Sequence, residues 1–210
     1  IASNRPVNAA FVEQIGDLFV ECIVAPDFSQ EARQLLANKK NVRLLEMPDT
    51  DIQPLHEWRS IVRGALRQKL DVGDPPDAPD WRVVTQRKPS EAEMQALRFA
   101  WQAVQPVKSN AILLAKSEAD MFFTVGIGGG QPNRVDCVRI AGQRAGERAS
   151  GSVLASDAFF PFPDGVQVAA DLGVTALIQP GGSRGDEGVI AAADQLGLAM
   201  VFTGVRHFRH

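Results

Sequence analysis

The sequence of 210 residues predicts an α/β protein, because helices and apolar strands alternate at both ends of the chain. In the C-terminal part, helices at 164–172 and 186–196 are each followed by a glycine and then by an apolar strand, at 174–178 and 198–203. Glycine directly after a helix is the usual left-handed stop. These two helix–glycine–strand units are the clearest signal of the fold class.

The N-terminal part repeats the alternation. Apolar spacing predicts a helix over 5–21, followed by a short buried strand at 22–25. The apolar positions on one face of that helix are Phe11, Ile15, Leu18 and Phe19. Ser29 is a good N-cap for a second helix over 30–38, and the next strand is expected at 42–47. A strand, a helix and a strand in this order favour a parallel pair.

The segment 71–80, DVGDPPDAPD, holds three prolines and four aspartates in ten positions. Such a segment favours an exposed connection. We therefore expect one subdomain over 1–85, which includes this linker, and a second over 86–210, which carries the ligand-binding residues.

Within the second subdomain, Ser90 and the acidic residues behind it open a helix that runs toward Val104. The elements expected next are paired strands at 111–116 and 122–125, a turn at 117–120, a glycine cluster at 126–130 and a helix over 134–145.

Composition narrows the functional classes. The net charge of −3 and the isoelectric point near 5.6 argue against a nucleic-acid surface. The sequence contains no run of about 18 apolar residues, the length needed to span a membrane. Cys22 and Cys137 lie in apolar segments, which favours buried reduced thiols in a cytoplasmic protein over a disulfide. The string GIGGGQ lacks the third glycine of a dinucleotide fingerprint, no P-loop string occurs, and the three histidines have no metal-ligand spacing.

Several candidate site residues stand at the predicted ends of elements. Asn110 precedes a strand, and its carboxamide can both donate and accept, although a turn residue is the more common role of an asparagine there. Arg134 opens a helix after the glycines, where it could bind a carboxylate or simply be a solvated side chain. Asp157 and Asp164 flank a run of phenylalanines that, by residue type, belongs in a core.

The aromatic run and two other segments are expected to meet. Phe159 offers one ring that could line a pocket, the string QPGGS begins at Gln179 after one strand, and Arg206 and Phe208 follow another strand. Ligands in α/β sheets bind at the carboxyl ends of strands. We therefore expect these segments to converge on one rim of the sheet.

Longer strings identify a family. They are VVTQRKP, FAWQAV, VKSNAILLAK, GIGGGQPNRVD, SDAFFPF, QPGGS and MVFTGVRHFRH, with a weaker likeness in IASNRPV, VECIVAP and KKNVRLLE. The chain thereby resembles the C-terminal part of the AICAR formyltransferase domain in the bifunctional AICAR formyltransferase/IMP cyclohydrolase family of purine biosynthesis. AICAR is aminoimidazole carboxamide ribonucleotide.

The resemblance implies transfer of a formyl group from 10-formyltetrahydrofolate to the amine of AICAR. It also implies a homodimer with active sites at the interface and two cytidine-deaminase-like subdomains, of which this chain would hold the end of the first and the complete second one. No partner nucleic acid or membrane is implied.

The resemblance further implies roles for single residues. They are Asn110 at the formyl group, Phe159, Arg206 and Phe208 on AICAR, Arg134, Asp164, Gln179 and Pro180 on folate, and Ser109 and Asp157 near a potassium ion. The potassium site departs from the pattern, because Val107 and Ala111 lack side-chain oxygens that relatives carry there. The folate contacts also stay open at 131–133, where Gln-Pro-Asn replaces the usual Gln-Met-Ser.

The family's catalytic Lys-His pair is expected upstream of Ile1, because no lysine is followed by histidine in this sequence. We therefore expect the chain to be the substrate-binding part of a larger formyltransferase and to be inactive without the segment that carries this pair. The alternative is a non-catalytic nucleotide- or folate-binding module that regulates a partner.

Overall fold

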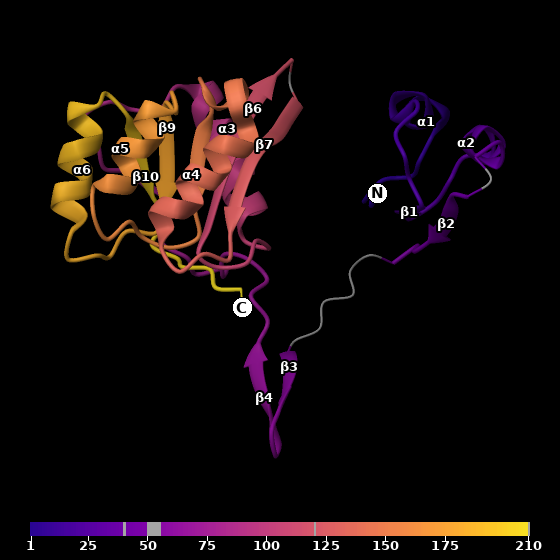
Figure 1. Ribbon diagram of the computed structural model, residues 1–210, viewed down its shortest axis with the longest axis horizontal. Helices are drawn as coiled ribbons and strands as arrows, with labels where there is room; N and C mark the ends of the chain where they lie inside the picture. Colours follow the sequence, from indigo (N-terminus) through magenta and orange to yellow (C-terminus); the bar gives the residue numbers. More distant parts are fainter. Residues whose placement is uncertain (40, 50–55, 120, 210) are drawn as a thin grey trace. The chain divides into compact units, whose positions relative to one another are not determined.

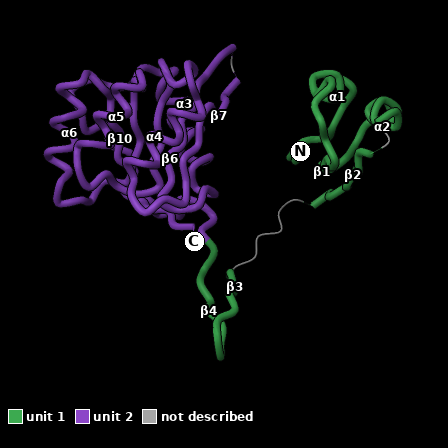
Figure 2. Tube along the Cα trace, in the orientation of Figure 1, with its two compact units in different colours: residues 1–70 green, residues 71–210 purple. Residues whose placement is uncertain are grey.

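The structure is a computed structural model that describes residues 1–39, 41–49, 56–119 and 121–209. It divides the chain into two compact units, Ile1–Leu70 and Asp71–His210, which Figure 2 draws in different colours. The sequence placed a boundary after residue 85. In the structure, 71–85 groups with the second unit, where Asp71 and Asp74 bind the side chain of His207.

The first unit confirms the predicted strand–helix–strand order. Its elements are α1 (Ala9–Ile15), β1 (Cys22–Ala25), α2 (Gln30–Ala37), β2 (Arg43–Glu46), β3 (His56–Ile61) and β4 (Gly64–Lys69). Strands β1 and β2 are parallel, and the Ser29 hydroxyl accepts a hydrogen bond from the Ala32 amide as the cap of α2. The antiparallel hairpin β3–β4 was not predicted from the sequence.

Helix α1 is shorter than the predicted helix over 5–21. Its N-cap is Asn8, and it ends at Gly16, whose φ is 52°. Leu18 and Phe19 therefore lie beyond the helix and are 62% and 81% exposed. The prediction was wrong here because a glycine in the left-handed region ends the helix before its apolar pattern does.

The second unit is a mixed α/β structure that contains the helices and strands predicted for it. Its elements are β5 (Arg82–Val83), α3 (Glu91–Val104), β6 (Ala111–Glu118), β7 (Met121–Gly129), α4 (Arg134–Ala145), β8 (Val153–Ser156), α5 (Asp164–Asp171), β9 (Ala176–Gln179), α6 (Asp186–Gln195) and β10 (Ala199–Phe202). The predicted turn at 117–120 includes Asp120, which lies outside the described residues. No helix in the described part of the chain is long and apolar enough to cross a membrane.

Six strands form one sheet in the order β5-β10-β9-β8-β6-β7. Strands β8, β9 and β10 are mutually parallel, whereas β6 is antiparallel to both β8 and β7. The sheet lies between helices: α3 packs on one face, and α4, α5 and α6 pack on the other (Figure 1). Along β8, Leu154 faces the three helices while Val153 and Ala155 face α3, as the period of a strand requires.

The helix start predicted at Ser90 is confirmed, and it takes the form of a capping box. The Ser90 hydroxyl accepts from the Glu93 amide at 3.2 Å, and the Glu93 carboxylate accepts from the Ser90 amide at 2.8 Å. Glu93 also receives two hydrogen bonds from Arg87, at 2.7 and 2.9 Å. These bonds lower the pKa of Glu93 from 4.5 to about 2, because they favour its charged form.

Gly126, Gly128 and Gly129 of the glycine cluster belong to strand β7, and Gly130 directly follows it. A β-carbon added to Gly128 would lie 2.0 Å from the carbonyl oxygen of Cys137, and one added to Gly126 would lie 2.1 Å from that of Ala141. Only residues without a side chain can let this strand approach the backbone of α4 so closely. The glycines therefore set the distance between α4 and the sheet.

Candidate functional site

The candidate site is one rim of the six-stranded sheet. Parallel strands β8, β9 and β10 all end there, and they are followed by Asp157, Pro180 and Thr203. Strand β6 runs in the opposite direction, so its first residue, Ala111, lies at the same rim, and Asn110 directly precedes it. This topology brings together segments that are far apart in the sequence, as predicted.

Arg206 and Phe159 meet at this rim. The guanidinium carbon of Arg206 lies 4.6 Å from the centre of the Phe159 ring, a cation–π contact, and its Nη2 donates to the carbonyl oxygen of Gly182 at 3.3 Å. Gly181 and Gly182 have φ of 70° and 86°, and a β-carbon on Gly181 would lie 2.3 Å from Phe202. The QPGGS turn therefore requires its glycines, and it brings a main-chain acceptor to Arg206.

Gln179 supports this rim from the protein interior. Its side chain is completely buried, and its Oε1 accepts from the Phe160 amide at 2.8 Å while its Nε2 lies 3.3 Å from the Met200 sulfur. The next residue, Pro180, is also buried. Both residues were predicted to contact folate. The hydrogen bond from the Phe160 amide makes Gln179 a support of the aromatic run, and the folate contacts of both residues stay a prediction.

Arg134 is the centre of a buried polar network. It is 9% exposed, and its guanidinium donates to Ser156 Oγ at 2.7 Å, to Asp157 Oδ1 at 2.7 Å and to Asn110 Oδ1 at 3.1 Å. Asn133 caps α4 by accepting from the Asp136 amide, which fixes the first turn of the helix that carries Arg134. Arg134 was predicted to face the folate tail. In the structure its donors serve three protein acceptors.

The carboxamide of Asn110 is held in one orientation. Its Nδ2 donates to the carbonyl oxygens of Gln131 and Pro132, at 2.9 and 3.2 Å, and its Oδ1 accepts from Arg134. Both amide hydrogens are therefore used, and one lone pair of Oδ1 remains for a ligand. In this conformation Asn110 can accept a hydrogen bond from a substrate but has none left to donate.

A pocket of about 450 Å³ opens beside this network. Asn110, Arg134 and Asp164 all line it, so three of the predicted site residues lie around one cavity. Phe162, which is 66% exposed, and Phe160, which is buried, contribute apolar surface. Asp164 is exposed at the start of α5, and its Oδ1 accepts a hydrogen bond from the Gly165 amide at 2.8 Å. A ligand with hydrogen-bond donors on an apolar ring would suit these walls.

Asp157 has one carboxylate oxygen to spare. Oδ1 pairs with Arg134, whereas Oδ2 is buried and has no hydrogen-bond partner among the described residues. Ser109, the other residue predicted near potassium, accepts from the Arg209 amide at 3.1 Å through its hydroxyl. The unpaired oxygen of Asp157 is therefore the feature that bears on an ion site.

The C-terminal tail is held by Asp71 and Asp74, two residues that the sequence analysis did not assign to the site. Both nitrogens of the His207 ring lie close to carboxylates, with Nδ1 2.9 Å from Asp71 and Nε2 3.0 Å from Asp74. Phe208 is 48% exposed, and its amide donates to Asp71 at 3.2 Å. The sequence analysis interpreted 71–80 as an exposed connection because of its three prolines and four aspartates. The sequence carries no signal that these aspartates bind a histidine at the other end of the chain.

Cys137 lies against the network without offering reactivity. Its Sγ is 3.1 Å from the carbonyl oxygen of Asn110, and burial raises the pKa of its thiol. A thiol that stays protonated is a poor nucleophile. Both cysteines are free, as predicted, but only Cys137 is buried, whereas Cys22 is half-buried.

Comparison with known proteins identifies the family of this chain. The family model described as "AICARFT/IMPCHase bienzyme" matches residues 1–144, well over half of the chain. The chain belongs to the AICARFT/IMPCHase bienzyme family. It is 53% identical over 218 aligned residues to the bifunctional purine biosynthesis protein PurH of Chloroflexus aurantiacus, covering 100% of this chain and 41% of that protein.

Two further members give the same coverage. The chain is 50% identical to PurH of Bacillus subtilis and 47% identical to PurH of Oceanobacillus iheyensis, in each case over 100% of this chain and 40% of the relative. The chain thus spans about two fifths of the curated AICARFT/IMPCHase relatives it matches. The family resemblance identified from the sequence is therefore confirmed.

Proposed function

We propose that this chain is the AICAR- and folate-binding part of a formyltransferase that uses 10-formyltetrahydrofolate. The observation that carries the proposal is that Asn110 lies in one network with Arg134 and also lines the pocket that contains Asp164. Family membership supplies the reaction class, and the rim supplies groups suited to it. A cytidine-deaminase-like subdomain is part of the proposal, supported by the helix–sheet–helix layers.

The reaction sets the requirements. The amine nitrogen of AICAR attacks the formyl carbon, a new C–N bond forms, the bond between that carbon and N10 of folate breaks, and one amine proton is transferred overall to N10. The amine is a weak nucleophile because its electrons delocalise into the imidazole. Holding its lone pair toward the formyl carbon is therefore a large part of what the protein can contribute.

Asn110 is suited to that orientation. Its free Oδ1 lone pair can accept one amine N–H, while the other bonds of the carboxamide keep that lone pair fixed. We assign Arg206, Phe159 and Phe208 to AICAR, because a guanidinium stacked on one ring offers planar donors next to apolar surface. We assign Asp164 to the pterin of folate, whose amino edge would donate to the carboxylate.

We assign Arg134, which lines the pocket, and the buried Gln179 and Pro180 to the folate side of the site. The guanidinium of Arg134 orients Asn110, and Gln179 holds the aromatic run at Phe160. Proton transfer is assigned to the Lys-His pair of the longer protein, and we propose that the active protein is a homodimer. Sedimentation of the full-length protein as a monomer would contradict the dimer.

Ser109 and Asp157 are proposed as contributors to a potassium site. The support is the buried Asp157 Oδ2, since a carboxylate oxygen without a partner suits a hard cation. A bound ion would raise the melting temperature with concentration. If potassium stabilises the protein no more than tetramethylammonium at equal ionic strength, the ion is not bound.

The decisive experiment replaces Asn110. In the full-length protein, Asn110→Ala should lower kcat for formyl transfer by roughly 10²-fold with a smaller effect on the KM for AICAR, because the lost contact orients the reacting amine. Asn38→Ala, at an exposed asparagine of the first unit, is the control. Normal turnover by Asn110→Ala would remove Asn110 from the site. Tight ligand binding without turnover by the unmodified protein would favour the regulatory module instead.

A further inference from the structure

The C-terminal tail after β10 carries both Arg206 and Phe208, and a single buried side chain lies between them. His207 is 1% exposed, whereas the residues on either side of it are exposed. The tail therefore alternates, with one side chain pointing inward and its two neighbours presented to solvent. Whatever holds the His207 ring also determines where its two neighbours point.

The His207 ring lies between two carboxylates, one at each of its nitrogens. Nδ1 lies 2.9 Å from both oxygens of Asp71, and Nε2 lies 3.0 Å from Oδ1 of Asp74. An ionised carboxylate can only accept hydrogen bonds, so a ring nitrogen that carries a proton donates to the aspartate beside it. Among the titratable side chains described, these two aspartates are the ones bonded to the ring.

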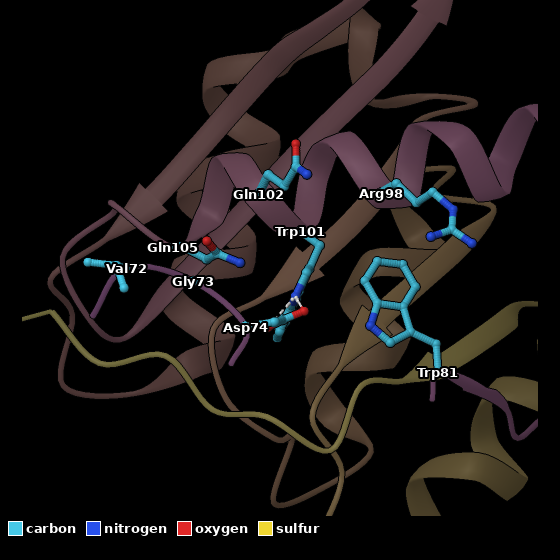
Figure 3. Close-up of a pocket in the computed structure, with 8 residues that line it drawn as sticks. All are labelled: Val72, Gly73, Asp74, Trp81, Arg98, Trp101, Gln102 and Gln105. Carbon is cyan, nitrogen blue, oxygen red and sulfur yellow. Dashed lines mark hydrogen bonds between the residues drawn. The ribbon is translucent and has the colours of Figure 1, made fainter. Parts of the chain in front are cut away.

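The aspartates are themselves fixed. Asp74 accepts from the Trp101 indole nitrogen at 2.9 and 3.0 Å, as the dashed lines in Figure 3 show, and the Trp101 ring lies 4.9 Å from the His207 ring. Trp101 belongs to α3 and is fully buried, so this side of the ring is attached to the core. Asp71 also accepts from the Phe208 amide at 3.2 Å.

The main chain of His207 is tied to the site at the same point. Its amide donates to the carbonyl oxygen of Asp157 at 3.0 Å, and Asp157 pairs through its side chain with Arg134. The ring and the amide of one residue thus connect the tail to α3 on one side and to the rim on the other.

We propose that His207 is a positioning residue for nucleotide binding, held between Asp71 and Asp74 so that Arg206 and Phe208 face AICAR together. The proposal rests on the proposed function, since it takes Arg206 and Phe208 as AICAR contacts. His207 does not touch the nucleotide, because its ring is buried behind them. Its contribution is to remove conformational freedom from two contact residues before the ligand arrives.

The test uses the two amide side chains that imitate single edges of histidine. In His207→Asn the amide nitrogen takes the place of Nδ1 and keeps the bond to Asp71, while in His207→Gln it takes the place of Nε2 and keeps the bond to Asp74. His207→Ala keeps neither. The measured quantities are kcat and the KM values for AICAR and folate in the full-length protein, with melting temperature as the check on folding.

His207→Ala should raise the KM for AICAR by about 10-fold, with the folate KM changed by less than about twofold, because positioning is lost only for the nucleotide contacts. Asn and Gln should fall between alanine and histidine. Adding Asp74→Asn should have little further effect in the Asn variant, which no longer uses Asp74, but a clear effect in the Gln variant. Arg209→Ala, an exposed tail residue, is the control.

Two further results separate the proposals. If Arg206→Ala raises the KM for AICAR and His207→Ala does not, the positioning role is wrong while the proposed function stands. If Arg206→Ala has no effect, the assignment of AICAR to this rim is wrong. Equal changes of both KM values, or a lower melting temperature with unchanged kinetics, would reduce His207 to a stabilising residue. Should His207→Ala fail to fold, the Asn and Gln variants decide by the same criteria.

Discussion

Replacing Arg134 with methionine tests the buried network most directly. Arg134 and Asp157 have side chains 8% and 2% exposed and lie 2.7 Å apart, and the same guanidinium serves Ser156 and Asn110. Arg134→Met keeps most of the volume but leaves a buried carboxylate without its cation. Removing one partner of a buried ion pair costs about 3–5 kcal/mol, so we expect a loss of unfolding free energy in that range.

The assay is urea denaturation of the chain in a Trp58→Phe background. Trp58 is 65% exposed in the first unit, and the remaining tryptophans, Trp81 and Trp101, both belong to the second unit. Their fluorescence then reports the unfolding of the second unit alone. A two-state transition with an unchanged slope allows the free energies to be compared.

Two companion variants make the result decisive. Arg139→Met breaks an exposed ion pair with Asp136 on the same helix, at 3.0 Å, and should cost at most about 0.5 kcal/mol. Adding Asp157→Asn to Arg134→Met should recover at least about 2 kcal/mol, because the buried charge is then gone. A loss below about 1 kcal/mol in Arg134→Met, or no recovery in the double variant, would refute the network as described.

Three other predictions follow from the same geometry. Arg206→Ala should raise the KM for AICAR by roughly 10²-fold, more than any His207 variant, since a planar set of donors and a ring contact are lost together; a KM within about twofold of the original would contradict it. Asp164→Asn should weaken folate saturation and leave the KM for AICAR unchanged, because an amide puts a donor where the pterin edge also donates; impaired AICAR binding with normal folate binding would place Asp164 in the wrong pocket. Arg87 holds the pKa of Glu93 at about 2, below its unfolded value of 4.5. The ionised Glu93 therefore contributes its full stabilisation of the folded state above pH 4.5, and this contribution disappears as the pH falls through 2. Glu93→Gln should therefore remove roughly 1–2 kcal/mol at pH 7, allowing for the partial exposure of Arg87, and almost nothing near pH 2; an equal loss at both pH values would exclude the ion pair as the cause.

The sequence predicted the second unit well because its element ends carry their own signals. The capping box at Ser90 and the glycines at 173 and 197, with φ of 80° and 69°, mark helix ends by local chemistry. The hairpin β3–β4 carries no such signal. All positions of β4 are exposed, so it has no alternation of apolar and polar residues to detect.

The site also has a part that could be predicted from the sequence and a part that could not. The meeting of Phe159 with Arg206 follows from topology, because their strands are parallel and end at one rim. The burial of Arg134 and the binding of His207 by Asp71 could not be predicted. Each joins residues more than 20 positions apart through side-chain contacts that leave no local pattern.

The glycines of β7 have a consequence for how sequence variants in this chain should be interpreted. A methyl group at Gly128 would meet the Cys137 carbonyl and displace the first turns of α4 outward, and Arg134 stands on the first of those turns. Asn110 would then lose the donor that fixes its carboxamide. A substitution at Gly128 that left the protein folded would thus act at a distance, by changing the orientation of the Asn110 carboxamide. Its effect would be seen in turnover and be easily mistaken for damage to packing alone.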